Sequence, residues 1–147
     1  AQRGDGSIYE HEEAVRKGLA TWMSVQGDGI FGSRPGTGFG EGPSLTYKAP
    51  AGAAKEAPIP YTAEDVRFMT KGGALYAYVM SPPQNGQVLI KSLASGSPHL
   101  SGRKVAGVSV LGAGKAKFTQ TSEGLAVTLP ASAYNITVGL KVTGVLA

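Results

Sequence analysis

The sequence predicts a mainly β protein with one N-terminal α-helix, a Gly/Pro-rich linker and an antiparallel β-sandwich of about seven to eight strands. Three observations lead to this prediction. An apolar stripe with helical spacing is confined to the first 26 residues. The 147-residue chain contains 22 Gly and 9 Pro, a composition that favours many short elements over a few long helices. From residue 61 onward, turn signals separate short apolar or alternating runs, as in a β-sandwich.

The helix is expected at about residues 8–26. Ser7 and Glu10 have the spacing of a capping box, in which each side chain satisfies a free backbone N–H at the helix start. Glu13 and Lys17 are spaced for an ion pair along the helix, and Gly27 is expected to end it. Apolar residues recur at i, i+4, i+7 and i+8 on one side: Val15, Leu19, Trp22 and Met23. This stripe has to be buried against another surface.

The linker is expected at about residues 27–60. The dipeptide Arg34-Pro35 is followed by glycine at every second position from 36 to 42, and residues 49–60 are rich in Ala and Pro. Such a composition predicts an extended or looping chain with little helix.

The strands of the sandwich are expected after Tyr61. Lys71-Gly72-Gly73 indicates a hairpin turn between the first two of them. In the last one, Ile136, Val138, Leu140 and Val142 alternate with smaller or polar residues, a pattern typical of a half-buried strand. The expected strands are residues 65–70, 74–80, 87–91, 104–111, 115–120, 125–129 and 136–142.

Composition excludes several classes of protein. The absence of cysteine removes disulfides, thiolate metal sites and cysteine nucleophiles. No apolar run approaches the roughly 20 residues that span a bilayer, so no membrane partner is expected. The net charge of +4 comes from basic residues scattered over separate segments, whereas nucleic-acid binding needs them clustered with stacking aromatics. We therefore expect no nucleic-acid partner.

The motifs predict no catalytic site in this chain. The run from Gly27 to Gly32 matches G-x-G-x-x-G, but it follows a predicted helix, whereas a dinucleotide-binding loop follows a strand. The two histidines, His11 and His99, belong to different segments, so we expect neither a Ser-His-Asp set nor a metal site. We therefore assign no catalytic, substrate-binding or metal-binding residue and expect no cofactor.

An ordered set of short segments nevertheless resembles one enzyme family. These segments resemble the end of the catalytic barrel and the C-terminal β-sandwich of the α-L-fucosidases of glycoside hydrolase family 29. Four residues replace the usual Asn, Glu, Tyr and Thr of the family: Gln26, Asp28, Phe31 and Ser33. The changes are mild and lie in the linker. The matching segments are Arg3–Ile8, Gln26–Pro35, Phe39–Pro43, Asp65–Phe68, Gly73–Ala77 and Gly124–Pro130.

The resemblance implies a division of the chain and a function. Residues 1–43 would be the end of the barrel region, with the last helix of a (β/α)8 barrel, and residues 44–147 the C-terminal sandwich. The chain would be the C-terminal portion of a retaining exo-α-L-fucosidase, which hydrolyses terminal α-L-fucosyl linkages. Its partners would be the catalytic barrel of the same protein and, through the complete enzyme, fucosylated glycans. The family's catalytic and fucose-binding residues match nothing here, so this chain alone is expected to be inactive.

Three further expectations follow. The enzyme would be periplasmic or secreted. Without a barrel, the helix would fold onto the sandwich, self-associate or fray. The alternative function is a free-standing, non-catalytic sandwich that binds carbohydrate on exposed aromatic rings, although core positions are favoured for Tyr76 and Tyr78. The candidate rings are Tyr47, Tyr61, Tyr76, Tyr78 and Tyr134.

Overall fold

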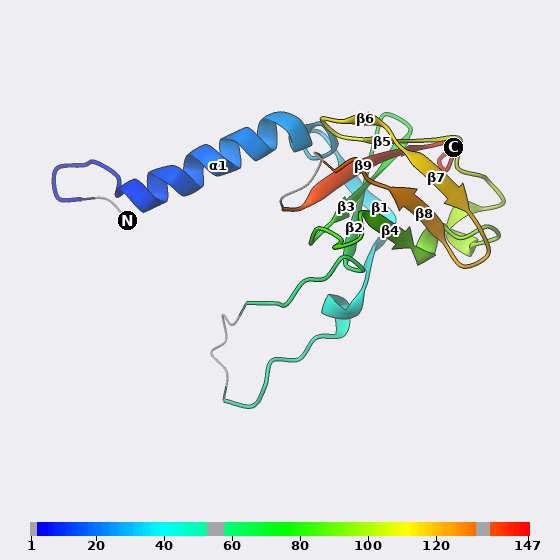
Figure 1. The fold of residues 1–147 in the computed structure, drawn as a ribbon, viewed down its shortest axis with the longest axis horizontal. Coiled ribbons are helices and arrows are strands. Elements are labelled where there is room, and N and C mark those ends of the chain that lie inside the picture. The colour runs from blue at the N-terminus through cyan, green and yellow to red at the C-terminus, as the bar shows by residue number, and fades with distance from the viewer. Residues whose placement is uncertain (1–2, 53–57, 132–135) are drawn as a thin grey trace.

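A computed structural model describes residues 3–52, 58–131 and 136–147. In these residues, nine strands form two antiparallel sheets, which pack face to face as a sandwich, with helix α1 projecting from one side (Figure 1). The larger sheet has the order β1-β2-β3-β9-β5-β6, and the smaller one has the order β4-β8-β7. The predicted mainly β fold is therefore confirmed.

The elements have the following bounds. The helix α1 is Glu10–Gln26, and short 3-10 turns occupy Gly27–Gly29, Pro43–Thr46, Lys91–Leu93 and Pro98–Leu100. The strands are β1 Arg34–Glu41, β2 Val66–Lys71, β3 Ala74–Val79, β4 Gln87–Ile90, β5 Gly107–Val110, β6 Gly114–Lys115, β7 Lys117–Gln120, β8 Leu125–Thr128 and β9 Val138–Thr143. None of the helices in the described ranges is long and apolar enough to cross a bilayer.

The core lies between the two sheets. Alternate residues of each strand point inward, so Leu125 and Val127 of β8 are buried while Ala126 and Thr128 are exposed. In β9, Val138, Leu140 and Val142 are fully buried, as their alternation predicts. Burying a side chain of this size contributes about 1.5–3 kcal/mol. Ile136, expected to continue this pattern, precedes the strand and is exposed.

The predicted hairpin joins β2 to β3. Lys71 pairs with Ala74, which leaves Gly72 and Gly73 as a two-residue turn with φ of +57° and +76°. Positive φ at both central residues is the geometry of a type I′ turn, which glycine adopts without strain. The Gly-Gly signal in the sequence is therefore confirmed.

The linker contains a strand that the sequence did not reveal. Strand β1 pairs with β2, from Arg34 opposite Thr70 to Glu41 opposite Val66, and forms one edge of the larger sheet. Its register shifts between Pro35 and Gly40. The alternate glycines deprive this strand of an apolar face, and proline is tolerated on an edge strand. Residues 34–41 of the expected linker are therefore part of the larger sheet.

The helix forms without its predicted capping box. The N-cap residue is Tyr9, and no side chain caps this end. Instead, Asp5 Oδ1 accepts hydrogen bonds from both the backbone N–H and the hydroxyl of Ser7, a local turn that competes with capping. The predicted ion pair is present, with Lys17 Nζ 3.0 Å from Glu13 Oε1.

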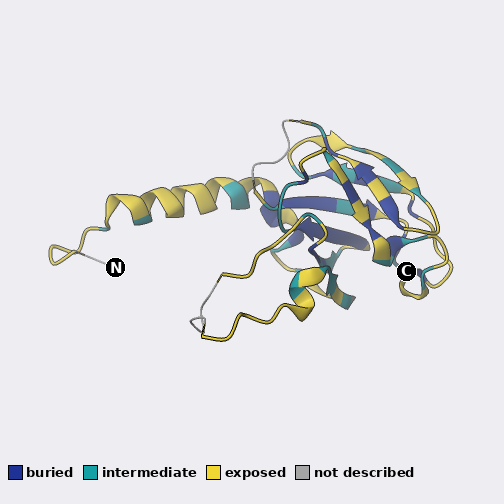
Figure 2. Ribbon diagram, turned by 60° about the horizontal axis from the view of Figure 1, so that its bottom comes forward, coloured by how far each residue is buried: buried dark blue, intermediate teal, exposed yellow. Residues whose placement is uncertain are grey.

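The apolar stripe of α1 remains uncovered over most of its length. Val15 is 70% and Leu19 58% exposed, and Figure 2 shows that the helix is largely solvent-facing until it reaches the sandwich. Trp22 and Met23, nearer the sheet, are half-buried. Of the expected fates of a free helix, folding onto the sandwich is therefore confined to the end that carries Trp22 and Met23.

Candidate functional site

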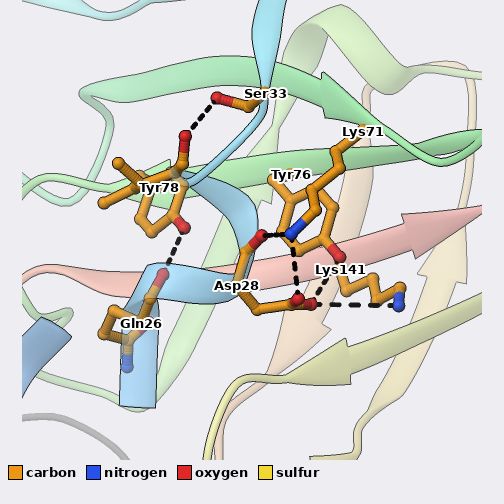
Figure 3. A network of polar contacts seen from close by, with 8 residues as sticks. Gln26, Asp28, Ser33, Lys71, Tyr76, Tyr78 and Lys141 are labelled. Atoms are coloured by element: carbon orange, nitrogen blue, oxygen red, sulfur yellow. Dashed lines mark hydrogen bonds and ion pairs between the residues drawn. The ribbon is translucent and has the colours of Figure 1, made fainter. Parts of the chain in front are cut away.

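The last turn of α1 and the segment after it are fastened to the outer face of the larger sheet, and we call this contact the joint (Figure 3). Strand β3 lies in the middle of that sheet and is buried on both faces. Leu75, Ala77 and Val79 enter the core between the sheets, whereas Tyr76 and Tyr78 lie on the opposite face. These two tyrosines, with Ala74, form a second apolar cluster against Trp22, Ile30, Met69 and Leu111.

Four hydrogen bonds from uncharged donors join the end of α1 and Asp28 to β3 and β9. The Tyr78 hydroxyl donates to the Gln26 carbonyl at 2.6 Å, and Gln26 Oε1 accepts the N–H of Gly139 at 2.7 Å. Tyr76 donates to Asp28 Oδ2 at 2.6 Å. Trp22 Nε1 donates to the backbone carbonyl of Thr137, just before β9, at 2.8 Å. The end of the helix is thus bonded to both β3 and the start of β9.

Ion pairs add to the joint on its solvent-exposed side. Lys71 Nζ donates to the Asp28 carbonyl at 2.6 Å and lies 3.3 Å from its carboxylate, while Lys141 Nζ lies 4.0 Å from that carboxylate. The hydrogen bond from Tyr76, aided by Lys71, lowers the pKa of Asp28. Such exposed ion pairs contribute little stability individually, so the tyrosine hydrogen bonds and the aromatic packing dominate the joint.

The two tyrosines have perturbed acidities. Burial raises the pKa of Tyr76 to about 12, and the adjacent Asp28 carboxylate adds to the effect. Burial also raises the pKa of Tyr78 to about 12. Both hydroxyls therefore stay protonated at neutral pH and act as hydrogen-bond donors, a structural role.

Glycine makes the close approach possible. A Cβ on Gly139 would lie 2.7 Å from Gln26 Oε1 and 2.8 Å from the side chains of Leu111 and Tyr78. A Cβ on Gly29 would overlap the ring of Tyr76. Any larger residue at either position would push the helix end away from the sheet.

The described candidate sugar-binding rings divide into a buried pair and an exposed pair. Tyr76 and Tyr78 are buried, as predicted for core positions, so neither can stack on a sugar. Tyr47 and Tyr61 are exposed in the segment between β1 and β2, and Arg67 lies over Tyr61 at 5.9 Å from its ring centroid. Tyr134 lies outside the described residues.

The other chemistry-bearing residues also stay separate. The glycine motif from Gly27 to Gly32 lies after α1 and before β1, the reverse of a dinucleotide-binding loop. His11 lies on α1 and His99 on a 3-10 turn. Within the described ranges, no three His, Cys, Asp or Glu side chains are grouped to bind a metal ion.

Gln26 and Asp28 are the residues whose importance the sequence did not reveal. They looked like mild changes in a linker, yet they accept the hydrogen bonds of Tyr76, Tyr78 and Gly139 across the joint. A signal was present in β3, where Tyr76 and Tyr78 share one face of an otherwise apolar strand. Buried tyrosine hydroxyls usually find a hydrogen-bond partner, so polar acceptors had to lie against that face.

Comparison with known proteins covers both the helix and the sandwich. The family profile described as the α-L-fucosidase C-terminal domain matches residues 60–143, more than half of the chain. No curated protein sequence matches the chain significantly. The structure of an α-fucosidase from Thermotoga maritima in complex with a mechanism-based inhibitor is similar with a TM-score of 0.65 and 19% identity. That match covers 97% of this chain but 29% of the T. maritima chain.

Two other solved structures give a similar result. A family 29 α-L-fucosidase from Bacteroides thetaiotaomicron, trapped as a covalent intermediate, has a TM-score of 0.59 and 12% identity over 97% of this chain. A bacterial fucosidase bound to an inhibitor has a TM-score of 0.59 and 13% identity over 100% of it. This chain covers 27% of each of those proteins. At these identities the likeness establishes the fold, helix included.

Proposed function

The chain belongs to the α-L-fucosidase C-terminal domain family, and on that premise we propose that it is the C-terminal portion of a retaining exo-α-L-fucosidase. In this proposal it supports a catalytic (β/α)8 barrel and supplies none of the catalytic residues. The complete enzyme hydrolyses terminal α-L-fucosyl linkages of glycans in the periplasm or outside the cell.

One observation carries the proposal: α1 is held at one end and uncovered along its apolar stripe. A 17-residue helix is marginally stable in water without packing along its apolar side. Burying Val15 and Leu19 would contribute about 1.5–3 kcal/mol each. The outer ring of a (β/α)8 barrel consists of helices packed in this way, which supports α1 as the last of them.

Two of the described carboxylates are committed to structural contacts, which supports a catalytic centre elsewhere in the enzyme. A retaining glycosidase needs two carboxyl groups about 5–5.5 Å apart that face the substrate. Asp65 is fully buried and occupied by hydrogen bonds, and Asp28 is engaged by Tyr76 and Lys71. Neither is available as a nucleophile.

The first test measures the native polypeptide. An antibody raised against this chain would isolate the protein from its source, for mass determination and for hydrolysis of 4-nitrophenyl α-L-fucoside. A barrel of about 250 residues joined to this chain predicts a polypeptide of roughly 400 residues that is active. The 147-residue chain alone should release no 4-nitrophenol. A native product of this chain's own size, without a barrel partner, would contradict the proposal.

The second test separates docking from folding. Leu19→Asp should leave the free energy of unfolding of the 147-residue chain within about 0.5 kcal/mol, because the side chain is exposed there. In the complete enzyme it should destabilise the barrel by about 2 kcal/mol or more, because it buries a charge. Leu89→Asp, on the exposed face of β4, is the control. Equal effects of the two variants in the complete enzyme would count against the helix as a docking element.

A further inference from the structure

A second projection leaves the sandwich between β1 and β2, and we call its described parts, residues 42–52 and 58–65, the β1–β2 arm. Figures 1 and 2 show it extending from the sheets on the same side as α1, with open space between the two. Neither view shows it lying against the sandwich. A segment of this length that has no hydrophobic core of its own must be held in position by other contacts.

The base of the β1–β2 arm is rigidly fastened. Asp65 is fully buried; its Oδ1 accepts the N–H of Ser44 at 2.7 Å, and its Oδ2 accepts the N–H of Thr62 at 2.8 Å and its hydroxyl at 3.1 Å. The guanidinium of Arg67 donates to Ser44 Oγ at 2.6 Å and to the Glu41 carbonyl at 3.2 Å. Outgoing and returning segments are thus held side by side, so the direction of the arm is set by the sheet.

Exposed apolar side chains concentrate on the two projections. Of the twelve large apolar side chains that are exposed in the described ranges, four belong to α1 and its N-cap residue, and four belong to the β1–β2 arm. Those of the arm are Leu45, Tyr47, Ile59 and Tyr61. Grouped apolar exposure of this kind marks an interaction surface, whereas an arm that only links two strands would be polar.

The two surfaces fit one occupant. They project to the same side, so a single large body can contact both. The match covers 29% of the T. maritima chain, and the unmatched 71% of that chain is large enough to be such an occupant.

We propose that the β1–β2 arm is a second docking element, so that the rest of the catalytic barrel is held between the arm and α1, its last helix. This inference rests on the proposed function. It adds that Leu45 and Ile59 are buried against the barrel, and that Asp65 and Arg67 serve docking by fixing the direction of the arm.

Cysteine labelling tests the proposal, because the chain contains no cysteine of its own. Leu45→Cys, Ile59→Cys, Leu19→Cys and Leu89→Cys would be made separately in the 147-residue chain and in the complete enzyme. The rate of maleimide labelling would be followed by mass spectrometry of the peptide concerned. In the 147-residue chain, all four positions should react quickly, since reactivity follows exposure.

In the complete enzyme, labelling at positions 45, 59 and 19 should be slower by about tenfold or more, while position 89 should remain fast. Fast labelling at 45 and 59 with protection at 19 would overturn this inference and leave the proposed function intact. Fast labelling at all four positions would overturn both. Protection at 45 and 59 that grows with the concentration of the 147-residue chain would make a second copy the occupant, and would also overturn the inference.

Discussion

The hydroxyl of Tyr76 donates a 2.6 Å hydrogen bond to the carboxylate of Asp28, 48 residues earlier in the chain. The bond connects the middle strand of the larger sheet to the segment that ends α1. Lys71 of β2 and Lys141 of β9 approach the same carboxylate. Side chains from three strands, β2, β3 and β9, therefore meet at Asp28.

Removing the Tyr76 hydroxyl should weaken the joint without creating a large cavity in it. We expect Tyr76→Phe to lower the free energy of unfolding by about 1 kcal/mol, the usual net value of one hydrogen bond. Urea denaturation followed by the fluorescence of Trp22, the single tryptophan, measures this change. Tyr47→Phe, at an exposed position, is the control and should be neutral; equal losses from both would show that the Asp28 bond contributes nothing specific.

Adding a methyl group at the joint should have a larger effect. Gly139→Ala places a Cβ 2.7 Å from Gln26 Oε1, and such overpacking costs about 1–3 kcal/mol. Gly18→Ala is the matched control, since nothing lies within 4 Å of its added Cβ, and alanine favours a helix over glycine by about 1 kcal/mol. The two variants should therefore shift the thermal midpoint in opposite directions. A stabilised Gly139→Ala variant would show that the helix end is not tightly packed on β9.

The two buried tyrosines should make stability fall at high pH. Because burial raises the pKa of Tyr76 and Tyr78 to about 12, above the usual value of 10, the folded chain holds these protons more tightly than the unfolded chain. Their contribution is complete below pH 10 and is lost as the pH rises from 10 to 12.

Absorbance at 295 nm, which reports tyrosinate, checks this directly. Tyr76→Phe and Tyr78→Phe should each remove amplitude from the part of the titration near pH 12. Loss of amplitude near pH 10 instead would mean that these hydroxyls are exposed to water.

The stability contributed by the buried Asp65 carboxylate, at the base of the β1–β2 arm, should be lost at low pH. Although burial opposes its ionisation, hydrogen bonds from Ser44 and Thr62 outweigh this and lower the pKa of Asp65 below 3.8. Its contribution to stability is therefore present above about pH 4 and is lost as the pH falls through the lowered pKa.

Asp65→Asn tests this role. An amide NH2 group would replace one acceptor oxygen and oppose an N–H donor, which costs about 1–3 kcal/mol. Glu64→Gln, at the exposed neighbouring position, should stay within about 0.5 kcal/mol of the original protein. Stability measured between pH 7 and pH 3 should fall less steeply in Asp65→Asn than in the original protein. An unchanged pH dependence would show that Asp65 is not the group responsible.

Local signals in the sequence predicted most of the sandwich. The Gly72-Gly73 turn and the alternation through Val138, Leu140 and Val142 each depend on neighbouring residues, so they could be interpreted without the structure. Strand β1 could not, because every second residue from 36 to 40 is glycine and the apolar period is missing. The strand is held by pairing with β2, which is distant in the sequence.

The joint was unpredictable for a similar reason. Gln26 finds its partners 52 and 113 residues away, at Tyr78 and Gly139, and Asp28 finds Tyr76 48 residues away. Within the linker itself, both residues look like ordinary polar positions. The predicted capping box failed because α1 begins at Glu10 with Tyr9 as its N-cap, two residues later than the box requires, while Ser7 is bonded to Asp5 instead.

The attachment of α1 at one end makes the helix a lever. Its 17 residues at 1.5 Å each extend about 26 Å from the joint, so a rotation of about 10° there would displace the far end by about 4.5 Å. A barrel docked along the helix would move with it. In the proposed enzyme, the stiffness of a few hydrogen bonds around Tyr76 and Tyr78 would therefore determine how accurately the barrel and the sandwich are aligned, and a small packing defect on one sheet would be magnified far from where it arises.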